Sequence, residues 1–159
     1  MRAPIASVTA AAIVIAVGCA PKDEGNLVIR CPSSDGAMAV NGGEVTIGGV
    51  AMHVAADLTG APSADEGMTF VIDVELPDSP AHAAPSVDCV RVEKTSQNAR
   101  WDARPFTVHE SFDGSTAHIQ ANGDHGPHWV SGDAVDVTVW LTVAERRYPL
   151  TLGHQQIQQ

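Results

Sequence analysis

Hydrophobic and polar residues alternate repeatedly along the chain after residue 26, and glycine, proline, aspartate and asparagine separate the alternating runs. A period of two is typical of β-strands that have one buried and one exposed face. We find no convincing 3.6-residue periodicity, which would indicate helices, in this part of the chain. The segments with the clearest strand pattern are 44–58, 69–77, 87–95, 105–121 and 134–152. The pattern therefore predicts an all-β protein.

The run 44–58 reads as two strands joined by a two-residue turn. The turn is Gly48-Gly49, where glycine can adopt the positive φ that tight hairpins need. This turn sets Ile47 opposite Val50 on the inner face, and Glu44 opposite His53 on the outer face.

A second hairpin is expected in 105–121, with its turn at Asp113-Gly114. Counting back from that turn places Phe106 and Val108 on the inner face, in the core. The same count places His109 directly opposite His118 on the outer face.

A third hairpin is expected in 134–152. Its first strand alternates valine and leucine from 135 to 143, and a four-residue turn over 144–147 returns the chain. Tyr148, Leu150 and Leu152 then face those inner side chains. About eight short strands without crossover helices favour an antiparallel β-sandwich, immunoglobulin-like in arrangement, over residues 27–159. A small β-barrel is the alternative.

The N-terminus has a different pattern. Met1-Arg2 is followed by an uncharged, mostly apolar stretch from residue 3 to 17, which is shorter than the roughly 20 residues that span a bilayer. This layout is typical of a secretory signal peptide, here residues 1–18.

The residues at the end of that stretch, Ala16-Val17-Gly18-Cys19, resemble the lipobox of bacterial lipoprotein signals. The resemblance implies cleavage before Cys19 and attachment of lipid to its sulfur and its amine. The family usually has leucine where this chain has Ala16. Residues 19–26 then form a polar tether, and Ala20 after the cysteine implies sorting to the outer membrane.

The composition adds an acidic balance, with 9 Lys+Arg, 19 Asp+Glu and a net charge of −10. The absence of a basic run argues against a nucleic-acid partner. Apart from Cys19, the cysteines are Cys31 and Cys89, and an even pair in an exported domain predicts a disulfide between them.

Candidate chemistry is sparse. His109 and His118, with His125 and His128 from the following loop, are candidate ligands for Zn²⁺ or Cu²⁺. The ordinary interpretation is that they are polar surface residues.

The tryptophans offer a second candidate. Trp101 and Trp129 are placed in loops and Trp140 on the polar face of its strand, where exposed rings could bind a glycan or a protein. The alternative is that loops such as 126–129 fold over these rings and bury them as a small second core.

No motif of a nucleophilic hydrolase, zinc protease or nucleotide-binding enzyme occurs in the sequence. The sequence therefore predicts a lipid-anchored, non-enzymatic protein of the bacterial cell envelope without a cofactor. It would present a binding surface to an envelope protein or a glycan. The alternative is a periplasmic Cu/Zn-binding protein that uses the four histidines.

Overall fold

The computed structural model describes residues 29–63, 66–78 and 84–159. The expected signal peptide, Cys19 and the tether lie outside these residues. Within the described part, no helix has the length and apolar character needed to cross a membrane.

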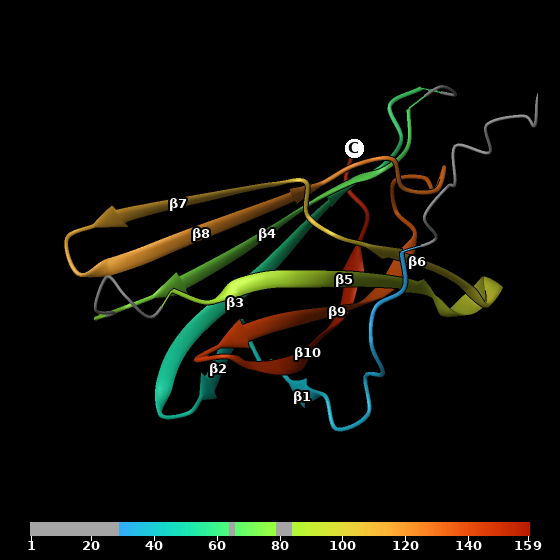
Figure 1. Ribbon diagram of the computed structural model, residues 1–159. Helices are drawn as coiled ribbons and strands as arrows, with labels where there is room; N and C mark the ends of the chain where they lie inside the picture. The colour runs from blue at the N-terminus through green and yellow to red at the C-terminus, as the bar shows by residue number, and fades with distance from the viewer. Residues whose placement is uncertain (1–28, 64–65, 79–83) are drawn as a thin grey trace, which may run out of the picture.

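The described chain forms two five-stranded sheets packed face to face (Figure 1). In sheet I the spatial order of strands is β1 (Met38–Ala39), β10 (Arg146–Gln156), β9 (Ala134–Val143), β5 (Ser86–Lys94) and β6 (Ala99–Ala103). In sheet II the order is β2 (Glu44–Ile47), β3 (Val50–Thr59), β4 (Thr69–Leu76), β8 (Thr116–Gly123) and β7 (Thr107–Asp113). A short 3₁₀ turn, η1 (Thr95–Gln97), joins β5 to β6.

This arrangement is a β-sandwich, as the alternation predicted, and it is not closed into the alternative barrel. All strand pairs are antiparallel except the short pairing of β1 with β10. The orders β3-β4-β8-β7 and β10-β9-β5-β6 correspond to the immunoglobulin orders A-B-E-D and G-F-C-C′. The chain crosses between the sheets after β4, β6 and β8, as in that topology.

The core lies between the sheets and is built from the inward residues of the alternating runs. Its largest fully buried side chains, other than Trp140, come from both sheets and from the segments beside them: Phe70, Ile47, Met52, Leu58, Met68, Ile72, Leu76, Leu141, Leu150, Ile157 and Val54. Removing this apolar surface from water is the main favourable term in folding.

The register of the first hairpin is confirmed. Ile47 pairs with Val50 and Glu44 with His53, around a turn in which both glycines have positive φ. The His53 Nδ1 lies 3.2 Å from Glu44 Oε1 on the outer face.

The predicted register of the second hairpin was wrong by two residues. Its turn is Gly114-Ser115, with φ of +60° at the glycine, so Asp113 pairs with Thr116. Glycine at the first central position is typical of a type II′ turn, whereas the prediction assumed glycine at the second. His109 consequently faces Gln120, and His118 faces Ser111.

The predicted four-residue turn of the third hairpin was also wrong. The turn has two residues, Ala144 and Glu145, with φ of +46° and +64°, and Arg146 pairs with Val143. The shift is again two residues, so Tyr148 still faces the inner side chains, opposite Leu141.

The largest departure from the prediction is the exposure of the inner face of β7 and of Phe106, which directly precedes this strand. Phe106, Val108 and Phe112 are 64%, 51% and 49% exposed, although the first two were expected in the core. The physical reason is the position of β7 at the edge of sheet II, where its extensive contacts are with β8 alone. The β7–β8 hairpin projects to the left in Figure 1, past the ends of the sheet I strands, so no described strand of sheet I covers β7 there.

Candidate functional site

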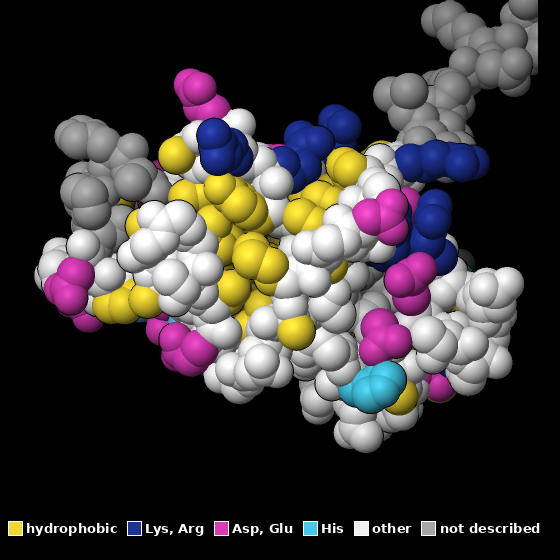
Figure 2. Space-filling view, turned by 90° about the horizontal axis from the view of Figure 1, so that it is seen from below, with side chains coloured by type: hydrophobic (Ala, Val, Ile, Leu, Met, Phe, Trp, Pro, Cys, Tyr) yellow, Lys and Arg dark blue, Asp and Glu magenta, His cyan; other side chains and the backbone are white. Residues whose placement is uncertain are grey.

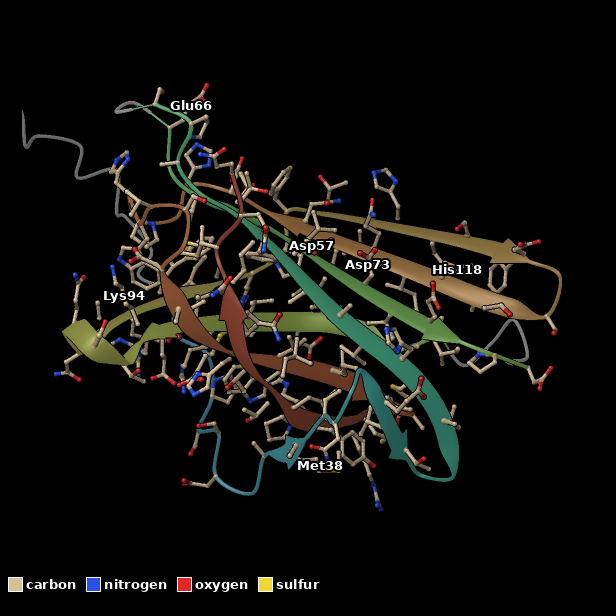
Figure 3. The ribbon with its side chains drawn as sticks, turned by 180° about the vertical axis from the view of Figure 1, so that it is seen from behind. Met38, Asp57, Glu66, Asp73, Lys94 and His118 are labelled. Atoms are coloured by element: carbon tan, nitrogen blue, oxygen red, sulfur yellow. A yellow bond between two sulfur atoms is a disulfide. The ribbon has the colours of Figure 1, made fainter. Side chains whose placement is uncertain are left out.

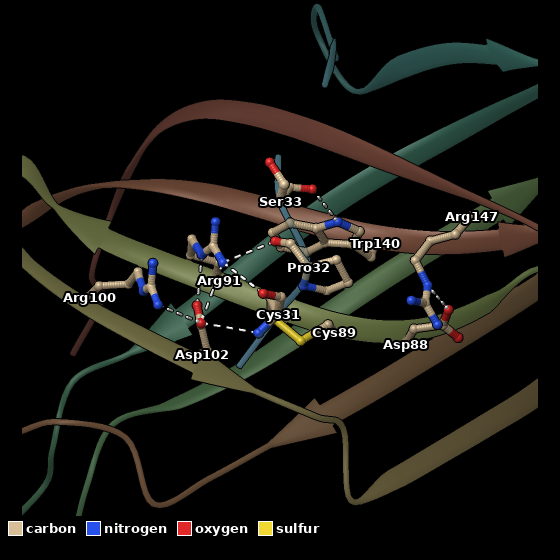
Figure 4. The surroundings of a disulfide bond; sticks show 10 residues. All are labelled: Cys31, Pro32, Ser33, Asp88, Cys89, Arg91, Arg100, Asp102, Trp140 and Arg147. Atoms are coloured by element: carbon tan, nitrogen blue, oxygen red, sulfur yellow. Dashed lines mark hydrogen bonds and ion pairs between the residues drawn. A yellow bond between two sulfur atoms is a disulfide. The ribbon is translucent and has the colours of Figure 1, made fainter. Parts of the chain in front are cut away.

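The outer face of sheet I is covered by the N-terminal described segment. A disulfide joins Cys31 of this segment to Cys89 on β5, as predicted (Figure 4). The two cysteines enclose Trp140, which is 1% exposed, and the indole Nε1 donates to the carbonyl of Ser33 at 3.3 Å. Trp140 is therefore sealed in a second small core, as the alternative interpretation held, although residues 31–33 provide the cover and the loop 126–129 does not.

A buried ion pair holds the same segment in place. The Arg91 guanidinium lies 5.0 Å from the centre of the Trp140 ring and donates through Nε to Asp102 at 2.7 Å. It also donates to the carbonyls of Cys31 and Pro32. The Asp102 side chain is only 3% exposed and accepts the Cys31 N–H at 3.1 Å, while Arg100 lies 3.3 Å from its second oxygen. These contacts tie β5, β6 and residues 31–32 together.

A second carboxylate lies at the other side of the disulfide. Asp88 accepts from the Thr142 hydroxyl and from the Nε of Arg147. Partial burial raises its pKa, but the hydrogen bonds from Thr142, Arg147 and Ser86 outweigh burial and hold the pKa of Asp88 below its usual value.

A cavity of about 650 Å³ opens beside β6. Its lining combines three arginines, Arg30, Arg100 and Arg104, with two aromatic side chains, Trp101 and Phe106. A smaller hollow of about 240 Å³ adjoins it and shares Arg30 and Arg104. Figure 2 shows lysine and arginine side chains along the upper and right border of the face seen from below, next to a band of hydrophobic side chains.

Trp101 supports the wall of this cavity. It lies on β6, not in a loop as predicted, and its ring packs against Phe70 with the ring centres 5.5 Å apart. A side chain at position 126 would collide with both Met68 and Trp101, so Gly126 lets the loop after β8 close over this contact. The indole is therefore fixed between the two sheets. Trp129 is half-buried against the main core.

The histidines predicted as metal ligands lie apart in two groups. His109 and His118 are diagonal neighbours on the outer face of sheet II and line a shallow hollow with Asp73 and Glu75 (Figure 3). The His118 Nδ1 lies 3.4 Å from Glu75 Oε1.

His125 is paired with Asp124 and borders the arginine-lined cavity, and His128 is exposed in the following loop. In residues 29–63, 66–78 and 84–159, no three His, Cys, Asp or Glu side chains come together in a metal-binding group. The metal site stays a prediction that the structure does not test.

The edge of β7 is the other exposed feature. Every residue from Val108 to Asp113 is exposed, and on one side of the strand no other described strand pairs with it. An edge strand presents unpaired backbone N–H and C=O groups that can pair with another chain. Its inward-facing residues are Val108, Glu110 and Phe112, so one carboxylate stands between two apolar side chains.

Comparisons of this chain with protein-family models, with curated proteins and with solved structures find no match. The functional interpretation therefore depends on the geometry described above.

Proposed function

We propose that this chain is a lipid-anchored, non-enzymatic binding protein of the bacterial cell envelope, and that the edge strand β7 binds an extended segment of a protein partner. The observation that carries the proposal is the concentration of exposed apolar side chains at this edge. The exposed large hydrophobic residues of the described chain are Ile29, Phe106, Val108, Phe112 and Val130. Three of these five lie within residues 106–112.

Such an edge is unusual in a soluble domain because it invites uncontrolled pairing. The opposite edge strand of sheet II, β2, has only four residues, and its inward Ile47 is buried. The edge β7 has seven residues and an uncovered apolar side. Peptide recognition by strand addition uses these elements, with backbone hydrogen bonds for affinity and alternate side chains for specificity.

The charge on β7 indicates the chemistry of the partner. In an antiparallel pair of two β7 strands that set Val108 opposite Phe112, Glu110 would stand opposite Glu110 of the second copy. Like charges directly opposite one another destabilise a sheet. A partner strand with a basic residue between two apolar ones, at two-residue spacing, would satisfy Glu110 and cover both apolar side chains.

The anchor rests on Cys19 and the lipobox that precedes it. Two or more acyl chains hold a soluble domain stably on a membrane. The ten-residue step from Cys19 to Ile29 reaches at most about 35 Å, so the sandwich would stay close to the lipid surface, which we propose is the outer membrane. The disulfide supports export, because disulfides persist in oxidising compartments.

Mass spectrometry of the protein extracted from envelope membranes tests the anchor. We expect a chain that begins at Cys19 and carries the added mass of acyl chains. A chain that retains residues 1–18, or one whose Cys19 is unmodified, would show that the proposed anchorage is wrong.

A charge-swap experiment tests the β7 proposal. The full chain in detergent is titrated with two fluorescent eight-residue peptides of alternating apolar and polar residues, one with lysine and one with glutamate at the central inward position. We expect the lysine peptide to bind more tightly, and we expect Glu110→Lys to reverse the preference. Glu75→Lys, on the outer face of β4, is the matched control and should leave the preference unchanged. Equal binding of both peptides by the unmodified chain, or a preference for the lysine peptide that persists in Glu110→Lys, would contradict the proposal.

A further inference from the structure

We infer that the cavity beside β6 is a second binding site, which adjoins the β7 edge at Phe106, and that its ligand is an acidic saccharide: a sugar that carries a carboxylate or a phosphate. The inference uses the proposed envelope location only for its biological setting. The binding chemistry stands on the residues that line the cavity.

The first observation is the concentration of positive charge. The chain has a net charge of −10 and only 9 Lys+Arg in 159 residues. Arg30, Arg100 and Arg104 nevertheless line one cavity, and Arg147 joins Arg30 and Arg104 in the adjoining hollow. Placing guanidinium groups together is unfavourable unless an anion is shared between them.

The two acidic side chains that line the cavity have partners among the described residues, and Asp124 is paired through Oδ1 with His125, which leaves its second oxygen as an acceptor. Asp102 lines the cavity, but its carboxylate is bound to Arg91, Arg100 and the Cys31 N–H. The other ion pairs of lysine and arginine among the described residues are those of Lys94 and Arg147. Arg30 and Arg104 form no ion pair with any described residue, so no carboxylate of residues 29–63, 66–78 or 84–159 neutralises their guanidinium groups. Guanidinium forks bind carboxylate and phosphate groups through two parallel hydrogen bonds.

The second observation is the mixture of groups around the arginines. Trp101 and Phe106 provide apolar surface, and the contact of Trp101 with Phe70 fixes that wall. Asp124 and His125 line the cavity as well and provide hydrogen-bond acceptors. A bare phosphate would use the arginines alone. A sugar acid would use the arginines for its anion, the acceptors for its hydroxyl groups and the aromatic wall for a ring face.

The size of the cavity is consistent with this ligand. Small-molecule sites enclose about 300–1,000 Å³, and this cavity has about 650 Å³. Ile29 on its rim is the first described residue, so a tether to Cys19 would hold the cavity near the membrane surface. A phospholipid headgroup is therefore the competing source of the anion, and the experiment has to separate the two.

The test is calorimetric titration of the full chain in detergent with trigalacturonic acid, with a neutral galactose trisaccharide, with inorganic phosphate, and with glycerophosphoglycerol, the water-soluble headgroup of phosphatidylglycerol. We expect binding of the acidic trisaccharide that weakens as salt is added. We expect binding of the neutral trisaccharide and of phosphate to be at least about tenfold weaker. The neutral sugar lacks the anion that the arginines would bind, and phosphate lacks the sugar ring and its hydroxyl groups. Equal binding of the neutral sugar, or tighter binding of phosphate or of glycerophosphoglycerol, would overturn the inference.

Variants locate the site. Arg104→Gln removes a guanidinium that no described carboxylate pairs, at an exposed position, and should weaken the acidic trisaccharide about tenfold or more. Arg146→Gln removes an equally exposed arginine that lines neither cavity, and it is the matched control. The variant Val108→Thr/Phe112→Thr changes β7 and should leave saccharide binding intact. If Arg104→Gln and Arg146→Gln behave alike, the anion does not bind in this cavity.

Discussion

Trp140 in sheet I and Phe112 in sheet II are two aromatic side chains whose burial is opposite to what the faces of their strands predict. Trp140 points away from the main core, on the outer face of sheet I, yet it is 1% exposed. Phe112 points to the inner face of sheet II, yet it is 49% exposed. The face on which a strand residue lies therefore does not decide its burial, because burial also requires another segment to cover that face.

The two regions differ in whether another segment of the described chain lies over them. Residues 31–33 cross the outer face of sheet I and are held there by the disulfide and by Arg91. The β7 strand lies at a sheet edge with β8 as its only extensive contact. We interpret the sealed region as structural and the uncovered region as the place for a partner.

The largest effect is expected from removing the cover itself. Cys31→Ser/Cys89→Ser opens a cross-link over a sequence separation of 58 residues. The chain-entropy argument gives a loss of about 4 kcal/mol in the free energy of unfolding, measured by urea titration. Trp140 fluorescence should shift to longer wavelength in the folded variant. Unchanged stability and an unchanged emission maximum would mean that the segment does not depend on the disulfide.

The next effect concerns the buried ion pair. Asp102→Asn leaves the Arg91 guanidinium buried without a carboxylate, which should cost about 3 kcal/mol. The double variant Arg91→Met/Asp102→Leu removes both charges and should recover part of that loss. Thermal and urea unfolding of the two variants measure the difference. A double variant less stable than Asp102→Asn would contradict this explanation.

A smaller effect is expected at acidic pH. The pKa of Asp88 is lower in the folded chain than its value of about 3.9 in the unfolded chain. As pH falls to about 4 and below, the unfolded chain therefore binds a proton at Asp88 more readily than the folded chain does. Stability from this group is therefore present above about pH 4 and is lost as pH falls through the lower folded pKa. Because Asp88 is partly exposed, solvent screening limits the contribution to a fraction of a kcal/mol. Asp88→Asn should flatten this part of the pH–stability curve, and a curve identical to that of the unmodified chain would contradict it.

The smallest effect on stability is expected at β7. Phe112→Thr replaces a half-exposed ring with a residue that also favours strands, so the free energy of unfolding should change by no more than about 0.5 kcal/mol. Binding of the lysine-centred peptide should nevertheless weaken. A large loss of stability would indicate that Phe112 belongs to the core after all.

Much of the fold could be predicted from alternation and turn residues. The two-residue period assigns each side chain to a face of its sheet. In the first hairpin, the turn Gly48-Gly49 also determines the register of β2 and β3, because both glycines can take positive φ. The other two hairpins each differed from prediction by two residues. A shift of two leaves every side chain on the same face, so the pattern could not detect it.

The candidate sites were harder to predict. The edge position of β7 depends on the order of strands in space, which the hydrophobic pattern does not contain. Arg30, Arg100 and Arg104 come from the N-terminal segment, from β6 and from the residues directly after it, and the disulfide and the contacts of Asp102 and Arg91 with residues 31–32 bring them together. The one signal in the sequence was the pair Arg100 and Arg104 on either side of Trp101, in a chain with few basic residues.

Amide hydrogen exchange along β7 in the full chain tests the central claim most directly. The measurement compares the chain alone with the chain saturated by the lysine-centred peptide, and β9, buried between β10 and β5, is the internal reference. We predict that the backbone amides between Val108 and Phe112 that point away from β8 exchange rapidly in the chain alone and become protected when the peptide binds. The amides of β9 should exchange slowly in both states. Slow exchange of all β7 amides in the chain alone, or no gain of protection with peptide, would contradict the account.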